Sequence, residues 1–320
     1  MTQVVNGYLD WEFERVDVRV IVSRDGSHGV RALRLFADAI SRILFLRHRR
    51  EDVVVVHLSQ GGSFVREGIL LVLASLRGLA TVAQLHGSSF AEFTARRPRI
   101  VRFVLRRASR IMTLSDETFE VARGLVGESR VTKVPNAVAS GTPVPKTQTL
   151  VFGGSVSERK GVDVLLPAWS RVPPEIRDGW RMLIAGPVAD PALVADVPDG
   201  VEVLGAVEHS RLMGLLDEAS IAVLPSRDEA MPMFILEALA RECCVIATTV
   251  GGIPDVLIGG AGTLVAPGDE DALAAALSGA LSDQTARLEA ARRGHQRYLA
   301  DFSAAAVYPR VEQCWLDARG

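Results

Sequence analysis

Two glutamates eight residues apart lie on either side of an expected helix start. Glu229 precedes Pro232 in the sequence, and Glu237 follows it within an apolar run. Proline has a fixed φ and no N–H, so Pro232 suits the first position of a helix. We therefore expect Glu229 in the preceding loop and Glu237 inside the helix, where the two carboxylates can accept hydrogen bonds from different parts of one ligand.

The backbone at this helix start forms a predicted anion site. The amides of Met233, Phe234 and Ile235 come before the first intrahelical hydrogen bonds, at the positive end of the helix dipole. A phosphate fits in front of these amides. Glu237, further along the helix, would accept from two hydroxyls of a ribose, and Glu229 would accept from hydroxyls of a sugar. The segment thus predicts a site for a sugar, a diphosphate and a ribose.

A second interpretation of the same segment needs no ligand. An amphipathic helix could bury Phe234, Leu236, Leu239 and Ala240 and leave two solvated glutamates, because charge on a helix usually marks its wet face. The neighbouring segments decide between the two interpretations, and they favour the site.

Glycine-rich turns follow three expected strands. The apolar runs 221–224 and 245–247 flank the helix and predict a βαβ unit, and ligands of open α/β sheets bind at the carboxyl ends of such strands. The second run is followed by the glycines at 251 and 252, where a backbone can approach a ligand closely. A third expected strand, 149–152, is followed by Gly153, Gly154, Ser155 and, further on, Lys160 and Gly161.

These motifs resemble a known family. Residues from about 149 to 283 are similar to the nucleotide-sugar domain of the retaining glycosyltransferase family 4, which has the GT-B fold. The matching motifs lie, in the order and at the spacing of the family, at 154–161, 225–238, 251–255 and 262–269. The first half is similar to the first domain of the polysaccharide-assembling branch of that family, through 57–68, 84–93, 112–117 and 134–138.

The resemblance implies roles for particular residues. Lys160 would stabilise the leaving diphosphate, Glu229 would position the sugar, and His86, which follows the expected strand 81–85, would contact the donor sugar. We take these three as the catalytic set. The expected donor-binding residues are Gly153, Gly154, Ser155, Arg159, Met233, Phe234, Ile235, Glu237 and Gly205.

Two departures from the family pattern bear most on function. Ser155 stands where most relatives carry an arginine that helps to neutralise the diphosphate, and Arg159 is the candidate to replace that charge. Relatives also begin with a strand and a Gly-rich loop, whereas no apolar strand followed by glycines precedes Val18 to Val22 here. The amino-terminal domain therefore looks truncated, either through a start codon assigned too late or because the first βα unit is absent, which would leave an exposed sheet edge.

The expected architecture is α/β, with two Rossmann-like doubly wound domains that face each other across a cleft, as the resemblance implies. The polar, proline-containing segment 140–149 marks the boundary. We expect an acceptor domain at 1–146, a nucleotide-sugar donor domain at 147–300, and a tail at 301–320 that packs back toward the first domain. A chain of 320 residues that is 48% hydrophobic can form two cores.

Composition predicts a cytoplasmic protein. No apolar run approaches the ~18 residues of a membrane span, and the polar start has no signal peptide. The three cysteines have no metal-binding spacing, and the cleft region shows no Asp-x-Asp motif, so we expect neither a metal nor another cofactor.

Positive charge gathers in the first half. Residues 1–146 have 22 Lys and Arg against 14 Asp and Glu, a net charge of +8, and the remainder has −10. Arg99, Arg102 and Arg106 are spaced along one face of a helix expected from Pro98 onward. With Arg66 they are candidate contacts for the acceptor or for anionic lipid. A solvated face is the alternative. Nucleic acid is not expected, because no aromatic is interleaved with the arginines and no known motif appears.

The remaining histidines carry weaker signals. His57, at an expected strand end, has two open interpretations, a structural hydrogen bond and an acceptor contact. The others are expected to be surface or structural residues: His28, His48, His209 and His295.

The sequence therefore predicts a retaining transferase that moves a hexose from a UDP- or GDP-linked sugar to a lipid-linked or polymeric glycan at the inner membrane face. Front-face attack would let the leaving phosphate oxygen take the acceptor's proton. The alternative is a non-catalytic nucleotide-sugar-binding partner of another glycosyltransferase, suggested by Ser155 and the shortened start. A nucleotide-sugar 2-epimerase of the same fold is disfavoured, because its acids and histidines do not match.

Overall fold

The computed structural model describes residues 2–47 and 51–319, so His48 lies outside the described residues. The chain forms two compact units. Unit 1 comprises the residues up to Asn136 together with those from Val307 onward, and unit 2 comprises Ala137–Ala306. The sequence-based division after residue 146 falls ten residues beyond this break.

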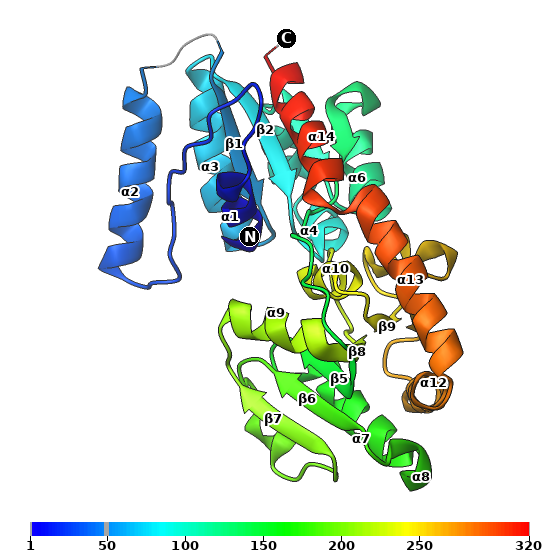
Figure 1. The fold of residues 1–320 in the computed structure, drawn as a ribbon. Helices are drawn as coiled ribbons and strands as arrows, with labels where there is room; N and C mark the ends of the chain where they lie inside the picture. Colours follow the sequence, from blue (N-terminus) through cyan, green and yellow to red (C-terminus); the bar gives the residue numbers. More distant parts are fainter. Residues whose placement is uncertain (1, 48–50, 320) are drawn as a thin grey trace. The chain divides into compact units, whose positions relative to one another are not determined.

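Unit 1 is built on a parallel sheet whose first strand is rich in valine. Its order is β1-β2-β3-β4 (Figure 1). The bounds are β1 Val53–Leu58, β2 Ala80–Leu85, β3 Arg110–Thr113 and β4 Val131–Lys133. β1 and β2 pair over their full length, so His57 lies opposite Gln84. Because side chains alternate along a strand, Val56 and Leu58 face the opposite side of the sheet from His57.

Four helices cover one face of this sheet, namely α3 (Gly62–Leu76), α4 (Phe90–Arg96), α5 (Pro98–Leu105) and α6 (Asp116–Val126). Their apolar side chains share one buried cluster with alternate residues of the strands. Leu58 and Leu85 from the strands, Phe64 from α3 and Leu105 from α5 are fully enclosed there. The alternate residues of the strands and the apolar faces of the helices thus pack together in one core.

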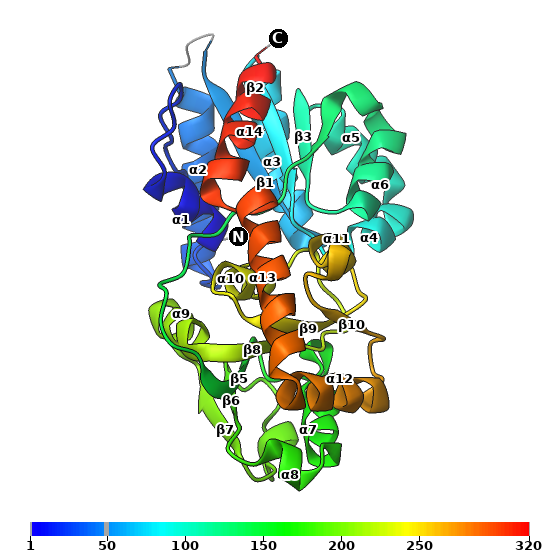
Figure 2. The same ribbon diagram turned by 45° about the vertical axis from the view of Figure 1, so that its right-hand side comes forward.

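The opposite face carries α1 (Thr2–Asp10) and α14 (Ala304–Asp317), so helices from the two ends of the sequence lie side by side (Figures 1 and 2). Tyr8 of α1 stacks edge-on against Trp315 and Tyr308 of α14, with ring centroids 5.2 and 5.6 Å apart. The hydroxyl of Tyr8 also lies 3.2 Å from Oε1 of the buried Gln84. This aromatic cluster fixes α1 over the sheet.

The sheet of unit 1 begins late in the chain. Residues 11–29, all of them described, contain neither helix nor strand. α2 (Val30–Phe45) then packs against α3, and Ile21 joins the small core between them. The first strand is therefore β1, which forms one edge of the sheet. Among the described residues, no strand precedes β1.

Unit 2 contains six parallel strands, in the order β10-β9-β8-β5-β6-β7. The bounds are β5 Thr147–Gly153, β6 Arg181–Ala185, β7 Val201–Gly205, β8 Ala219–Leu224, β9 Cys244–Thr248 and β10 Thr263–Val265. Numbered along the chain, this is the 3-2-1-4-5-6 order of a doubly wound sheet. Its direction reverses between β5 and β8, so the switch point lies there.

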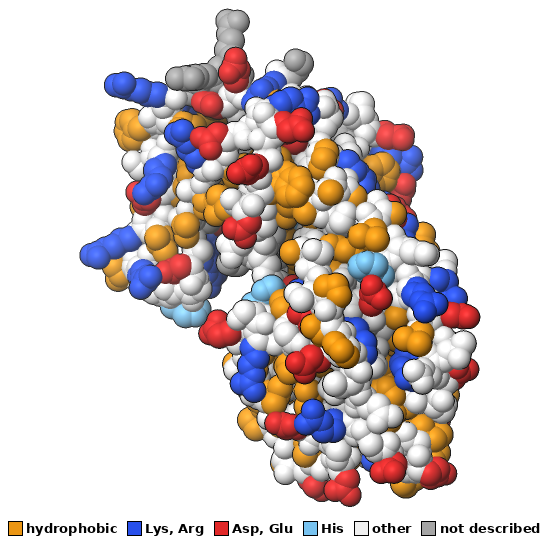
Figure 3. Space-filling view, viewed as in Figure 1, with side chains coloured by type: hydrophobic (Ala, Val, Ile, Leu, Met, Phe, Trp, Pro, Cys, Tyr) orange, Lys and Arg blue, Asp and Glu red, His pale blue; other side chains and the backbone are white. Residues whose placement is uncertain are grey.

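The helices of unit 2 are α7 (Val162–Arg171), α8 (Pro174–Arg177), α9 (His209–Glu218), α10 (Met233–Ala240), α11 (Ile253–Val256), α12 (Glu270–Ser282) and α13 (Gln284–Asp301). Every residue of α10 except Glu237 is apolar, and Phe234–Ala240 are all buried. Such a helix must lie inside the protein. Acidic side chains gather at the end of unit 2 that holds β7 and α8 (Figure 3).

Candidate functional site

The candidate site lies at the switch point of unit 2. β5 and β8 are neighbours in the sheet, with Phe152 opposite Val223. Lys160 ends a short 3₁₀ turn, Glu158–Lys160, that follows β5, and Glu229 lies in the loop that follows β8. The carboxyl ends of parallel strands meet at one edge of a sheet, and this edge is where open α/β sheets bind ligands.

Glycines bring the three strand-end loops together, backbone against backbone. A Cβ on Gly161 would lie 1.9 Å from the carbonyl oxygen of Pro225, and one on Gly251 would lie 1.5 Å from that of Glu229. Both glycines also have positive φ, +76° and +52°. No other residue fits these positions without displacing the backbone, so the glycines of the sequence motifs set the distances between the loops.

Lys160 and Glu229 form an ion pair at this junction. Nζ of Lys160 contacts Oε1 of Glu229, and the hydroxyl of Ser226 donates to the same oxygen over 2.8 Å. Their side chains are only 15% and 9% exposed. The interpretation of two solvated glutamates is therefore wrong, since Glu229 and Glu237 are both buried. The pair joins the two residues that the sequence assigned to the diphosphate and to the sugar.

The start of α10 differs from the prediction by one residue. Pro232 has φ −72° and ψ 120°, so it caps the helix instead of occupying the first helical position. The amide of Ile235 donates to the Pro232 carbonyl over 3.2 Å and is not an unpaired donor. The amides of Met233 and Phe234 remain ahead of that first bond. The ring of Phe234 lies where a Cβ on Gly153 would be, so α10 begins beside the end of β5.

Glu237 has a partner that the sequence analysis missed. Its Oε1 lies 2.8 Å from Nε2 of His209, the first residue of α9. The side chain of Glu237 is 5% exposed and that of His209 is 51% exposed. His209 therefore contacts the predicted ribose acceptor, whereas the sequence placed it among surface or structural residues. Its position four residues after Gly205, at a strand-to-helix turn, was the available signal.

The other predicted donor-binding residues surround the same edge. A Cβ on Gly154 would lie 3.6 Å from the Lys160 side chain. The carbonyl of Gly205, at the end of β7, accepts from the amide of Gly186 over 2.8 Å. The Ser155 hydroxyl reaches only the carbonyl oxygen of Pro187, at 3.4 Å.

Arg159, the candidate to replace the missing arginine, contacts the loop after β8. Its guanidinium donates to the carbonyl oxygen of Asp228 over 3.0 Å, and its side chain is on the surface. Of the cations at this junction, Lys160 is the one that pairs with Glu229.

In unit 1, His86 and His57 lie at the carboxyl ends of β2 and β1. Nδ1 of His57 lies 2.8 Å from Nε2 of His86, and the two rings are inclined by 24° with centroids 5.0 Å apart. Burial lowers the pKa of His57 to about 4, and burial and the neighbouring His57 lower the pKa of His86 well below its usual value. Both rings are therefore neutral near pH 7. Of the two interpretations of His57, the structural hydrogen bond is present.

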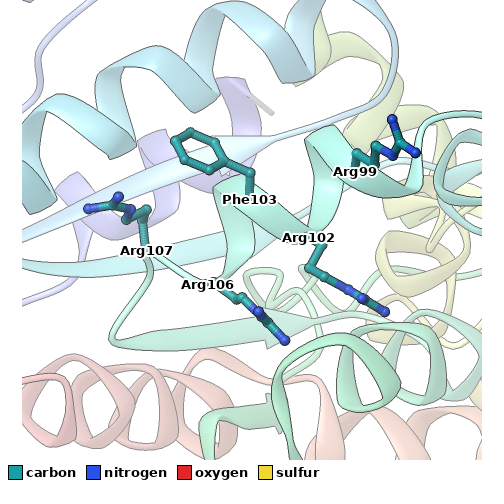
Figure 4. A pocket seen from close by; sticks show the side chains of 5 residues that line it. All are labelled: Arg99, Arg102, Phe103, Arg106 and Arg107. Atoms are coloured by element: carbon teal, nitrogen blue, oxygen red, sulfur yellow. The ribbon is translucent and has the colours of Figure 1, made fainter.

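The helix expected from Pro98 onward is present as α5, and Arg102 and Arg106 lie on one side of it while Arg99 extends away from them. Arg99, Arg102, Phe103, Arg106 and Arg107 line a surface hollow of about 380 Å³ (Figure 4). Arg102 and Arg106 extend to the same side of the helix, and Phe103 points away from them. Among the described residues, no Asp or Glu forms an ion pair with these four arginines.

One premise of the sequence analysis is wrong. Phe103 lies between the arginines along α5 and is 53% exposed, so an aromatic is interleaved with them. Arg66, unlike the arginines of α5, is paired with a carboxylate: its Nε donates to Glu67 over 2.8 Å. Glu67 is 7% exposed and also accepts from Ser23, so Arg66 is held within α3.

Within residues 2–47 and 51–319, no helix is long and apolar enough to cross a bilayer. The same residues contain no group of three or more His, Cys, Asp or Glu side chains that could hold a metal ion.

Comparison with known proteins identifies the domain that holds this site. Residues 147–283 match the family described as glycosyl transferases group 1. Glycogen synthase of Mycobacterium tuberculosis is 31% identical over 177 residues, which cover 53% of this chain and 42% of that protein. The phosphatidylinositol N-acetylglucosaminyltransferase gpi3 subunit of Schizosaccharomyces pombe is 26% identical over 253 residues, which cover 73% and 54%. The chain thus spans about half the length of these curated relatives.

Solved structures show the fold. Sucrose-phosphate synthase from Thermosynechococcus elongatus superposes with a TM-score of 0.71 at 21% identity, over 88% of this chain and 77% of that one. Anabaena HepE in complex with UDP-glucose superposes with a TM-score of 0.70 at 17% identity, over 87% and 81%. The expected α/β architecture is confirmed, and the fold is GT-B.

Proposed function

Because residues 147–283 form a glycosyl transferases group 1 domain, we propose that this protein transfers a hexose, with retention of configuration, from a nucleoside diphosphate sugar to a glycan. The relatives and neighbours support a sugar transferase, and HepE has been solved with UDP-glucose, which supports a UDP-linked donor. A GDP-linked donor fits the same protein groups.

The observation that carries this proposal is the Lys160–Glu229 pair at the switch point. A half-buried lysine, a buried carboxylate and the first amides of α10 lie around the end of β5. A nucleoside diphosphate sugar has groups for all three. Its diphosphate suits Lys160 and the amides, and its sugar hydroxyls suit Glu229. Glu237, buried one turn into α10, would then accept from the ribose.

The chemistry asks the protein to stabilise charge on the leaving diphosphate. As the bond to the anomeric carbon breaks, Lys160 would transfer its contact from Glu229 to a phosphate oxygen, and the α10 amides would add their partial charge. Such preorganised groups contribute most when they meet charge that develops in the transition state. A leaving oxygen that accepts the acceptor's proton from the same face would give retention, with Glu229 positioning the sugar.

Unit 1 supports an acceptor at a membrane. Its excess of positive charge includes the arginines of α5, and Ile100 and Phe103 are exposed beside them. Arginines attract anionic headgroups, and exposed apolar side chains can enter the headgroup region. A lipid-linked glycan would then be the acceptor, and a polymeric glycan is the alternative for a protein that stays in the cytoplasm.

One observation favours a second candidate function. Ser155 supplies no charge, and Arg159 is held by the carbonyl of Asp228, so Lys160 faces the diphosphate with less help than the family pattern provides. A protein that binds a nucleotide sugar without turning it over, as a partner of another glycosyltransferase, would tolerate this loss.

A thermal-shift screen over nucleotides and nucleotide sugars tests the proposal. A ligand at 100 times its Kd adds about 2.7 kcal/mol to the free energy of unfolding, which is a clear rise in Tm. We expect stabilisation by one nucleoside diphosphate and its sugars, and little by nucleosides. A screen in which no nucleotide or nucleotide sugar raises the Tm would contradict both candidate functions.

A further inference from the structure

Two histidines of unit 1 share one hydrogen bond. Nδ1 of His57, on β1, lies 2.8 Å from Nε2 of His86, directly after β2. The rings are nearly parallel, at 24°, with centroids 5.0 Å apart. The amide of His86 also donates to the carbonyl of Leu58 over 2.7 Å, so the backbone holds the two rings in register. The contact is therefore fixed by the β1–β2 pairing.

Among the described residues, the ring contacts of the pair are with uncharged side chains. Tyr8 packs against His57, with ring centroids 6.2 Å apart, and its hydroxyl is engaged by Gln84. Both imidazoles are mostly buried. Within the same part of the chain, neither His57 Nε2 nor His86 Nδ1 has a hydrogen-bond partner, and neither is an enclosed atom. Among the described residues, no other group occupies these two outer nitrogens.

The shared bond links the tautomers of the two rings. A neutral imidazole has one N–H, and the bond between Nδ1 of His57 and Nε2 of His86 holds one hydrogen. If His57 donates, His86 must carry its hydrogen on Nδ1. If His86 donates, His57 must carry its hydrogen on Nε2. The two rings therefore adopt the same tautomer, and the pair presents one donor and one acceptor through its outer nitrogens.

We propose that His57 is a positioning residue that ties the tautomer of His86 to its own, so that Nδ1 of His86 meets a sugar hydroxyl as donor or as acceptor only together with the matching state of His57. The role assigned to His86 rests on the proposed function. The pairing of the tautomers does not, because it follows from the His57–His86 geometry alone. A free histidine would present a mixture of tautomers, and part of the population would be wrong for its ligand.

A tautomer measurement tests the pair directly. Long-range ¹H–¹⁵N correlation spectra of the whole protein, labelled with ¹⁵N-histidine, distinguish Nδ1–H, Nε2–H and doubly protonated rings. The spectra of single-histidine variants assign the signals. At pH 7 we expect His57 and His86 to be neutral and to share one tautomer. If the two rings of the wild-type protein have opposite tautomers, or if one of them is protonated, the proposal is overturned.

Two substitutions at His57 separate positioning from packing. In His57→Phe the ring remains but the bond is lost, so the His86 signal should change to a mixture of tautomers. In His57→Asn an amide near the position of Nδ1 can restore the bond, so the His86 signal should return toward that of the wild type. A His86 signal that is the same in His57→Phe as in the wild type would overturn the proposal.

Turnover supplies the second readout. In metal sites, removing the residue that hydrogen-bonds to a ligating histidine typically costs about 10- to 100-fold in affinity or activity. By analogy, His57→Phe should lower kcat on the order of tenfold, and His57→Asn should recover most of that loss. Equal activities of the Phe variant and the wild type would overturn the positioning role. If no nucleotide sugar binds or reacts at all, the proposed function fails, and the tautomer spectra still decide whether the pair exists.

Discussion

Nζ of Lys160 contacts the carboxylate of Glu229, although the two residues lie 69 positions apart in the chain. The contact crosses the switch point between β5 and β8, and Gly161 and Gly251 make it possible by letting the loops touch. Without a ligand, each charge neutralises the other in a place where an isolated charge would be costly. A nucleoside diphosphate sugar can supply new partners for both residues, with phosphate oxygens for Lys160 and sugar hydroxyls for Glu229.

Glu237→Gln should weaken nucleotide binding. The substitution keeps the volume of a side chain that is 4% exposed and removes the negative acceptor for the ribose. Glu237→Ala is less suitable, because the burial of Glu237 means that alanine would leave a void. A hydrogen bond to a charged group contributes roughly 1.5–3 kcal/mol, which corresponds to a Kd raised about 10- to 100-fold. Isothermal titration calorimetry with the preferred nucleoside diphosphate measures it.

The matched control for this variant is Glu202→Gln, on the exposed side of β7. It removes the same charge from unit 2 without touching α10, so its Kd should equal that of the wild type. Binding by Glu237→Gln as tight as that of the control would show that the ribose assignment is wrong.

Ser155→Arg should tighten binding of the nucleoside diphosphate. Position 155 lies in the loop after β5, and its hydroxyl makes only a 3.4 Å contact that the substitution can lose cheaply. A new charge-assisted bond to the diphosphate is worth roughly 1.5–3 kcal/mol. The Kd of the variant by calorimetry, with Arg159→Gln as the comparison, measures the gain. Weaker or unchanged binding would mean that the site already has its full complement of charge.

The buried histidine pair should make folding sensitive to mild acid. The pKa of His57 is lowered to about 4, so the unfolded chain binds a proton there between its ordinary pKa near 6.5 and about 4, while the folded protein does not. The free energy of unfolding should therefore fall as the pH falls through this window, by at most ~1.4 kcal/mol per pH unit for each such group.

Urea unfolding at several pH values between 4 and 7 measures this dependence. His57→Phe removes one titrating group, so its free energy of unfolding should depend less steeply on pH than that of the wild type. Parallel curves for the two proteins would mean that His57 is not buried in its neutral form.

The arginines of α5 should bind membranes. Sedimentation with vesicles should show binding that rises with anionic lipid content and fades at high salt, because attraction to exposed charges is screened. Arg99→Glu, Arg102→Glu and Arg106→Glu together should reduce binding about 100-fold or more, at ~1 kcal/mol for each arginine lost. The Tm should change little, because exposed charges contribute little to folding.

A charge-matched control places three glutamates elsewhere in unit 1, at Arg24, Arg31 and Arg34, and should retain most of the binding. Sedimentation of the α5 variant at the wild-type level would move the membrane contact to another surface, or leave a polymeric glycan as the acceptor.

Local patterns predicted most of unit 2. The strand at 221–224, the helix after Pro232 and the glycines at 251 and 252 all appear where the sequence placed them, because period, proline and glycine act over a few residues. The Lys160–Glu229 and His209–Glu237 contacts were not predicted as contacts. Each joins side chains from separate loops or helices that follow different strands, and only the tertiary fold brings them together.

The start of the chain was the least predictable part. Tyr8 finds its partners in Trp315 and Tyr308 at the other end of the sequence, and no local pattern encodes such a contact. The helix boundary at Pro232 was wrong by one residue, because proline fits both the cap and the first helical position.

The central claim is that Lys160 stabilises the departing diphosphate of a sugar donor, and NMR-monitored turnover tests it most directly. With the donor found by thermal shift, wild type should release nucleoside diphosphate and a sugar product of unchanged anomeric configuration. Lys160→Met should lower kcat about 100-fold or more with a much smaller change in KM, since the charge develops only in the transition state. Lys133→Met, an exposed lysine of unit 1, should match wild type. A wild-type protein that binds the donor and releases no product would contradict catalysis and establish the non-catalytic partner instead.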